Sequence, residues 1–211
     1  MIPKIIHQIW MGPKKMPEDW MQTWRDKNPS MKYVLWREIE LEKFDFKFKD
    51  KIHYLLFSGK AKHYNYSVAS DIMRIEILDR FGGVYIDADS YCLEPIENEF
   101  FMKGDFFVGK IGDQLRGKRR WVNRVANGTI GSIPGHPVLK EYLKRISKHN
   151  VKKFEGFGGE MLTKCIKDKD VILLPVCAFT PKDWRRKNAP VEGKVYAKHM
   201  WGTGRKCYLD K

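Results

Sequence analysis

The sequence predicts one α/β domain built around a mostly parallel sheet that is flanked by helices. Its first 36 residues carry the pattern of a strand, a helix and a second strand, which is the unit of a doubly wound fold. Further along, an amphipathic segment stops at Gly82 and Gly83, and a short apolar run follows at once. With 211 residues, 43% of them hydrophobic, and no internal repeat or linker, the chain can bury one sizeable core.

The first elements follow from apolar runs and the residues that interrupt them. Residues 2–10 form a dense apolar run, which is typical of a buried strand. Pro17 opens a helix that Asn28 and Pro29 end, and residues 32–36 then form a second strand. A short helix is expected around residues 50–57.

A longer helix is expected before Gly82 and Gly83, with Ser67 or Ser70 as its N-terminal cap. The two glycines end this helix, and residues 84–87 then form a central strand. The apolar stripe of the helix consists of Val68, Ile72, Ile75 and Leu78.

The second half of the chain predicts further strands at residues 106–111, 129–133 and 171–176. A basic loop at residues 116–120 lies between the first two of these strands. One helix is expected from His136 and Pro137 to about residue 150, and another from residue 160 to about residue 167. The tail is rich in loops, and its charged end also fits one module of a longer polypeptide.

The composition limits the class of partner and the compartment. A formal net charge of +14 implies attraction to something anionic, such as nucleic acid, an acidic membrane surface or a phosphorylated small molecule. No signal peptide is visible, and no apolar run approaches the roughly 20 residues that span a bilayer. We therefore expect a cytoplasmic protein that is not secreted. Widely spaced cysteines argue against a zinc site or a disulfide framework and predict reduced thiols at Cys92, Cys165, Cys177 and Cys207.

Asp87 and Asp89 form the strongest candidate site in the sequence. They are separated by one residue and leave an apolar strand, so that a turn after Asp87 would point both carboxylates at one ligand. Hard oxygen ligands of this kind suit Mn²⁺ or Mg²⁺, especially where phosphate oxygens complete the shell. Such a pair alone is weak evidence, but Asp71 and Arg74 precede it, one helical turn apart on one face. In isolation they would be an ordinary ion pair worth ~0.3–0.5 kcal/mol.

Three segments together give the chain a recognisable pattern: residues 2–10, residues 69–89 and the His199-Met200-Trp201 run. In order and spacing they resemble the DxD sugar-binding glycosyltransferases of family 32. That group includes fungal initiating mannosyltransferases and bacterial capsular polysaccharide enzymes, and the glucosyltransferase domains of clostridial toxins share its core. The chain is also similar to the N-terminal glycosyltransferase domain of a chlorella virus protein. The resemblance is strongest over the first two segments and weak between residues 91 and 195.

The resemblance implies a GT-A fold, a nucleotide-sugar donor and a divalent metal, usually Mn²⁺. Ile9 and Trp10 match the position where the family binds the donor base, and the flat face of the indole suits uracil or thymine. Asp71 is implied to accept hydrogen bonds from sugar or ribose hydroxyls, and Arg74 to donate to sugar or phosphate oxygens. Asn127 matches a polar residue that faces the donor.

The resemblance also implies a metal site. Asp89 would bind the metal directly, while Asp87 would contact ribose or sugar hydroxyls and reach the metal through water. His199 matches a residue that supplies another ligand or touches the diphosphate, although a surface histidine is an equal alternative. Glu160 is the candidate general base, or else a first-turn residue favoured by the helix dipole. Because related retaining enzymes have Gly-Pro where this sequence has Gly-Gly-Glu, the stereochemical outcome stays open.

The expected function is transfer of a sugar from a nucleoside diphosphate sugar to a glycan or glycoprotein hydroxyl, catalysed with Asp87, Asp89 and Glu160. UDP-sugars such as UDP-glucose are favoured, dTDP-sugars are possible donors, and no nucleic-acid partner is expected. One alternative is a haloacid-dehalogenase-like phosphatase, in which Asp87 is the nucleophile and Asp89 the acid/base. The other is a basic nucleic-acid-binding module that uses residues 116–120 and 185–187.

Overall fold

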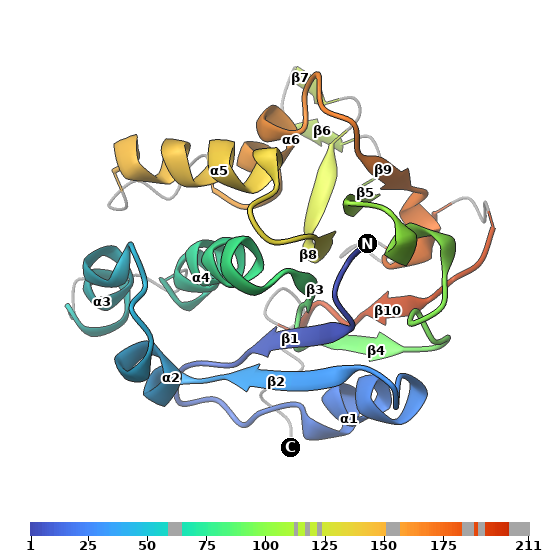
Figure 1. Cartoon of the computed structure of the whole chain (residues 1–211), viewed down its shortest axis with the longest axis horizontal. Helices are drawn as coiled ribbons and strands as arrows, with labels where there is room; N and C mark the ends of the chain where they lie inside the picture. The colour runs from blue at the N-terminus through green and yellow to red at the C-terminus, as the bar shows by residue number, and fades with distance from the viewer. Residues whose placement is uncertain are drawn as a thin grey trace.

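The computed structural model describes residues 1–58, 65–111, 114–116, 119–121, 124–150, 157–182, 188–189 and 193–202. Within these residues a six-stranded sheet runs through the molecule in the order β2-β1-β3-β8-β5-β9 (Figure 1). β1 pairs in parallel with β2 and β3, and β5 with β9, whereas β8 runs antiparallel to β3 and β5. The predicted mostly parallel sheet is therefore confirmed. Its strands are β1 (Ile5–Ile9), β2 (Lys32–Trp36), β3 (Gly83–Ile86), β5 (Phe106–Lys110), β8 (Val125–Ser132) and β9 (Ile172–Leu174).

Helices and short elements cover both faces of the sheet. One face packs against α2 (Glu38–Lys43), α3 (Lys49–Phe57), α4 (Asn65–Phe81), α5 (Pro137–Lys148) and α6 (Gly159–Cys165). The other face packs against α1 (Glu18–Lys27), the strands β4 (Ser90–Cys92) and β10 (Ala197–His199), and the 3₁₀ turns η1 (Phe100–Lys103) and η2 (Val176–Ala178). A hairpin of β6 (Gln114–Arg116) and β7 (Arg119–Trp121) completes the described elements.

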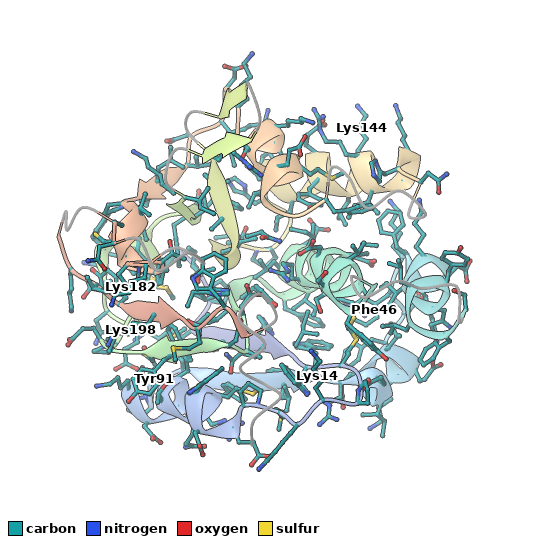
Figure 2. All side chains as sticks on the ribbon, turned by 180° about the vertical axis from the view of Figure 1, so that it is seen from behind. Lys14, Phe46, Tyr91, Lys144, Lys182 and Lys198 are labelled. Carbon is teal, nitrogen blue, oxygen red and sulfur yellow. The ribbon has the colours of Figure 1, made fainter. Side chains whose placement is uncertain are left out.

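Basic side chains lie on the outside of this fold. Lys144 on α5, Lys198 on β10 and the loop residue Lys182 are exposed, and Figure 2 shows Lys144 away from the other two. The positive charge of the chain is thus spread over the surface at these positions.

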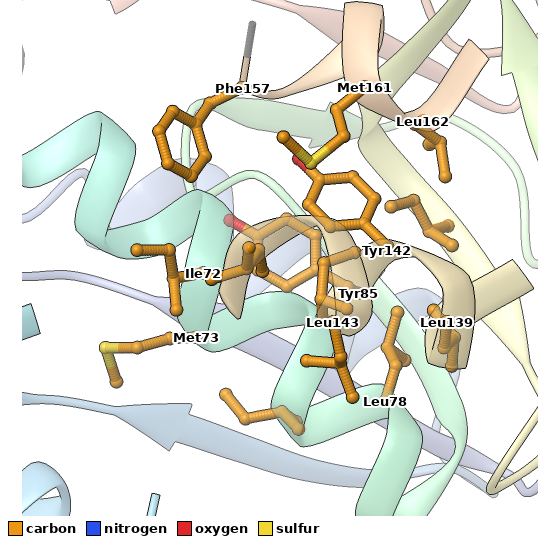
Figure 3. Close-up of a cluster of buried hydrophobic side chains, with 14 of the residues drawn as sticks. Ile72, Met73, Leu78, Tyr85, Leu139, Tyr142, Leu143, Phe157, Met161 and Leu162 are labelled. Atoms are coloured by element: carbon orange, nitrogen blue, oxygen red, sulfur yellow. The ribbon is translucent and has the colours of Figure 1, made fainter. Parts of the chain in front are cut away.

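The core forms because successive strand residues point to opposite faces of the sheet. In β3, Tyr85 joins the cluster beneath α4 and α5, while Val84 and Ile86 join the cluster on the other face. In β5, Val108 and Phe107 divide in the same way. Figure 3 shows the first cluster, in which side chains from α4, α5 and α6 meet around Tyr85.

Most elements lie where the sequence predicts them, but α4 begins earlier than expected. This helix begins at Asn65, so Ser67 and Ser70 lie inside it and neither is the cap. The Ser70 hydroxyl instead donates to the Tyr66 carbonyl at 2.8 Å. A serine inside a helix can bond back to the preceding turn in this way, which explains why a cap residue type gave a wrong boundary here.

Other elements were missed or only partly predicted. α2, β4 and β10 were not expected, and β8 begins at Val125 rather than near residue 129. The expected loop at residues 116–120 falls largely in the β6–β7 hairpin, with residues 117–118 outside the described residues. Short strands of this kind are set by pairing with distant segments and leave little periodicity in the sequence.

The cysteines are reduced where the structure describes them. Cys92, Cys165 and Cys177 are buried free thiols, and Cys207 lies outside the described residues. Burial raises the pKa of Cys92 to about 12 and that of Cys165 to about 11, so both remain protonated at neutral pH. In the part of the chain that is described, no helix has both the length and the apolar character needed to cross a bilayer.

The packing of β8 on β5 gives a testable prediction. Gly131 lies against the fully buried Phe107 ring, which an added methyl group would overlap. We expect Gly131→Ala to lower the free energy of unfolding by about 1–3 kcal/mol, measured by equilibrium urea denaturation. Gly109→Ala is the control, because its methyl would meet Phe179 at an ordinary 3.4 Å. Equal losses in the two variants would contradict this account of the packing.

Candidate active site

The candidate site lies at the edge of the sheet where β1, β2 and β3 end. Because these strands are parallel, their carboxyl ends meet at one edge, as in other open α/β sheets that bind ligands there. The pairing of His7 with Tyr85 places the end of β1 beside Asp87, and Gln8 Nε2 donates to the Asp87 carbonyl at 3.3 Å. Trp10 follows β1 and therefore lies at the same edge.

A turn after β3 sets the direction of the two aspartates. The Ser90 amide donates to the Asp87 carbonyl at 3.0 Å, and the Asp87 amide donates to the Gly128 carbonyl at 2.8 Å. The turn that the sequence predicts after Asp87 is therefore present. It places Asp89, only 9% exposed, on the same side as the strand β10.

The pairing of β4 with β10 brings His199 to this turn. His199 lies opposite Ser90 in the ladder, and its Nε2 atom is 3.2 Å from Asp87 Oδ2 and 3.5 Å from Asp89 Oδ1. One ligand atom from each of the three side chains lies within 4.8 Å of the others. The three residues named as metal ligands from the sequence are thus close together in space.

The donor atoms of this triad fit a divalent cation. Each carboxylate has one oxygen that is held by the protein. Asp87 Oδ1 forms an ion pair with Arg74 at 3.1 Å, and Asp89 Oδ2 accepts a hydrogen bond from the Gly202 amide at 2.8 Å. The other oxygen of each faces His199. Two carboxylate oxygens and an imidazole nitrogen suit Mn²⁺ or Mg²⁺ with further oxygen ligands from a substrate.

The charges of the triad are set by burial and by its neighbours. Burial would raise the pKa of Asp87, but Arg74 and His199 hold it well below its usual range. Burial would lower the pKa of His199, but the Asp89 and Asp87 carboxylates raise it above its usual value. Asp87 is therefore ionised at neutral pH, which favours a cation beside it.

Arg74 connects the triad to a second group of residues. Its guanidinium, in a residue only 5% exposed, lies 3.2 Å from Asp71 and 3.1 Å from Asp87, and donates to the Asn127 carbonyl at 2.6 Å. It also lies 4.2 Å above the Tyr85 ring. Asp71 and Arg74 thus form a buried network rather than an exposed ion pair.

Asn127 holds Asp71 through a second contact to the same oxygen that faces Arg74. Asn127 Nδ2 donates to Asp71 Oδ1 at 2.6 Å, and burial raises the pKa of Asp71 to about 6 although Arg74 opposes this shift. Gly158 has φ +67°, and a Cβ there would lie 3.1 Å from Asp71 Oδ2. Glycine is therefore needed at this position for both its backbone conformation and its small size.

The remaining expected residues take different positions. Ile9 is buried in the core, so any contact with a ligand would come from its backbone. Trp10 is half-buried, and its indole donates to the Lys14 carbonyl at 3.0 Å. Glu160 lies on the first turn of α6 and forms an ion pair with Lys164 at 3.1 Å. These contacts are those of an ordinary residue at the start of a helix. The role of Glu160 as a base stays a prediction.

Sequence reasoning missed the tyrosines that support the site. The Tyr85 hydroxyl donates to Asp87 at 2.9 Å, and Tyr142 accepts from the Gly158 amide at 2.9 Å. Tyr85 was visible as the polar member of an apolar strand that directly precedes the aspartates. Tyr142 gives no such signal, because its spacing in the sequence fits the apolar stripe of an amphipathic helix.

His7 supports the sheet edge without entering the triad. Its Nε2 hydrogen-bonds the Gly82 carbonyl at 3.0 Å, and its Nδ1 accepts from Trp36 at 3.1 Å. Burial lowers the pKa of His7 to about 4, so this ring stays neutral at physiological pH. His7 thus shapes the end of β1 through its contacts rather than through a charge.

The known proteins to which this chain is similar include glycosyltransferases. The family described as "Glycosyltransferase sugar-binding region containing DXD motif" matches residues 17–107. Inositol phosphoceramide mannosyltransferase 3 of Schizosaccharomyces pombe is 28% identical over 156 residues, which cover 70% of this chain and 38% of the relative. An uncharacterized glycosyltransferase of Acanthamoeba polyphaga mimivirus is 31% identical over 151 residues, covering 69% of this chain and 56% of the relative.

The fold agrees with a solved structure. The PaToxG glycosyltransferase superposes with a TM-score of 0.53 at 22% identity, covering 78% of this chain and 69% of that one. The fold is thus of the GT-A glycosyltransferase type, as the resemblance implied. Residues 17–107 match the family of sugar-binding regions that contain a DXD motif, and Asp87-Ala88-Asp89 has this pattern. The chain spans less than two fifths of the length of the yeast relative.

The Arg74 network predicts a large cost when the arginine is removed. We expect Arg74→Met to lower the free energy of unfolding by about 3–5 kcal/mol, because Asp71 and Asp87 would be left as uncompensated buried carboxylates. Arg145→Met is the matched control, since its partly exposed pair with Glu141 predicts about 0–1 kcal/mol. Urea denaturation measures both, and a similar small loss in each would contradict the role given to Arg74.

Proposed function

We propose that this domain transfers a hexose from a nucleoside diphosphate sugar to a hydroxyl group of a glycan or glycoprotein, and that the reaction requires a divalent metal ion. The observation that carries the proposal is the convergence of Asp87, Asp89 and His199 beside the buried Arg74 network. The three convergent side chains supply ligands for a metal that binds a diphosphate. The Arg74 network supplies polar groups for a sugar.

The parts of the donor are assigned by the chemistry of the residues. Asp87, Asp89 and His199 would hold Mn²⁺ or Mg²⁺, and the metal would neutralise charge on the departing nucleoside diphosphate. Asp71 and Asn127 would orient the sugar through its hydroxyl groups. Arg74 has five N–H groups, of which bonds to Ser70, Asn127, Asp87 and Asp71 occupy all but one among the described residues. Its main task is thus to hold Asp71 and Asp87 in place, with one N–H left for the donor.

The identity of the donor rests on Trp10 and on the relatives. The indole lies at the sheet edge where a pyrimidine could stack on it, which favours UDP-sugars and leaves dTDP-sugars as candidates. Several fungal relatives are named as mannosyltransferases, so mannose joins glucose as a candidate sugar. A cytoplasmic location, a viral origin and the acceptor class remain parts of this proposal.

The two alternatives receive no support from the site. A phosphatase needs Asp87 as a nucleophile, yet Arg74 and Tyr85 hold one of its oxygens and the other lies beside the candidate metal ligand His199. For a nucleic-acid-binding module, residues 185–187 lie outside the described residues, as do the side chains at 116–120. Neither alternative explains the buried link between Asp71 and Arg74.

A donor screen tests the function directly. Nucleotide release would be measured across UDP-, GDP- and dTDP-sugars with Mn²⁺, with Mg²⁺ and with EDTA. We expect release from UDP-sugars with Mn²⁺, background release in EDTA, and a loss of about 100-fold or more in Asp89→Asn, because one ligand of the metal is removed. Asp19→Asn, at an exposed position of α1, is the control and should keep full activity. Release that persists in EDTA, or in Asp89→Asn, would rule out the proposed mechanism.

A further inference from the structure

A second feature of the site is a cavity that opens where β5 and β8 separate. Val108 pairs with Ile130, but the next pair along the ladder is Lys110 with Val125, so Gly109 alone faces residues 126–129 of β8. Irregularities of this kind bend a strand and redirect its side chains. Residues from both sides of the gap, 109–111 and 124–129, line the cavity.

The irregular part of β8 serves two sites at once. On the side of β3 it continues the ladder, since the Gly128 carbonyl accepts the Asp87 amide at 2.8 Å. On the side of β5 it forms a wall of the cavity. Asp87, Asn127 and His199 belong both to the cavity lining and to the site described above. The cavity therefore adjoins the position proposed for the donor sugar.

The charged groups of the cavity favour an anion. Among its described lining residues, Lys110 and Arg124 are the permanent cations and Asp87 is the carboxylate. The oxygens of Asp87 are already engaged by Arg74, Tyr85 and His199. Lys110 is half-buried and forms no ion pair with any residue that the structure describes. An ammonium group in such a position stabilises a bound phosphate or carboxylate.

The uncharged groups of the cavity suit a sugar ring. Phe179 and Trp201 line it with aromatic rings, and Thr180, whose hydroxyl donates to the Val176 carbonyl at 3.0 Å, is a further lining residue. The indole of Trp201 is held by a hydrogen bond from its Nε1 atom to the Lys182 carbonyl at 2.9 Å. Aromatic faces beside polar groups bind the apolar side of a sugar while its hydroxyls are hydrogen-bonded.

From these observations we propose that the cavity is the acceptor subsite, and that it takes an acceptor sugar carrying an anionic group, with Lys110 binding that group. The inference rests on the proposed glycosyl transfer and adds the class of acceptor. It assigns to Lys110 a task in acceptor choice that is separate from binding of the donor diphosphate at Asp89 and His199.

Isothermal titration with three small probes tests the proposal. The probes are methyl α-glucoside, α-glucose 1-phosphate and methyl β-glucuronide, which are neutral, phosphorylated and carboxylated. Each is titrated into protein saturated with Mn²⁺ and UDP, so that the donor diphosphate position is filled, and then into protein without nucleotide. We expect at least one anionic probe to bind about tenfold or more tightly than the neutral one, as a charge-assisted contact predicts.

Variants of Lys110 assign the effect to this cavity. Lys110→Met should remove the preference for the anionic probe, and Lys110→Arg should retain it because the charge is kept. Lys144→Met, an exposed change on the outer side of α5, is the control and should behave as the unchanged protein (Figure 2). Equal binding of all three probes, or an unchanged preference in Lys110→Met, would overturn the proposal.

The outcome also separates this proposal from the proposed function. Binding of UDP with Mn²⁺ is measured before any probe is added, and its absence would count against the donor assignment alone. In that case, the titration without nucleotide still measures whether the cavity binds an anionic probe more tightly than the neutral one. If Lys110→Met instead weakens UDP binding and leaves probe binding intact, Lys110 serves the donor and the acceptor assignment is wrong.

Discussion

The buried guanidinium of Arg74 is the interaction on which the rest of the site depends. A charge in the core is costly unless it is paired and hydrogen-bonded, and here Asp71, Asp87 and the Asn127 carbonyl all meet it. These partners come from α4, from the end of β3 and from β8, so one side chain fixes three elements relative to one another. The same contact keeps Asp87 ionised and directs its second oxygen toward His199. The position of the candidate metal-binding side chains is therefore a consequence of how Arg74 is neutralised.

The fold could be predicted from the sequence wherever local patterns decide the structure. The limits of α1 and β2 follow from a proline, an asparagine and short apolar runs, and both lie where they are expected. The Asp71–Arg74 pair follows from helix periodicity alone. The start of α4 was wrong because Ser67 and Ser70 are cap residue types placed inside a helix. Local preference does not decide a boundary when tertiary packing extends the helix.

The rest of the site could not be predicted from local sequence patterns, because distant segments form it. His199 reaches the aspartates through pairing of β10 with β4, two strands of three residues each whose sequences show no clear alternation. Asn127 and Gly128 meet Asp71 and Asp87 in the stretch where β8 leaves the ladder with β5, and this irregularity depends on the packing of both strands. The resemblance to a family supplied His199 and Asn127 in advance. The cavity beside them, with Lys110 at its wall, had no counterpart in the sequence pattern.

The central claim is that Asp87, Asp89 and His199 bind one divalent metal ion. Titration with Mn²⁺, followed by electron paramagnetic resonance of the free ion, tests it without any assumption about the donor or the acceptor. The account predicts about one bound Mn²⁺ per chain and affinity weaker by about tenfold or more in Asp89→Asn and in His199→Ala, with no change in the control His53→Ala. Mn²⁺ binding that is the same in all four proteins would contradict it.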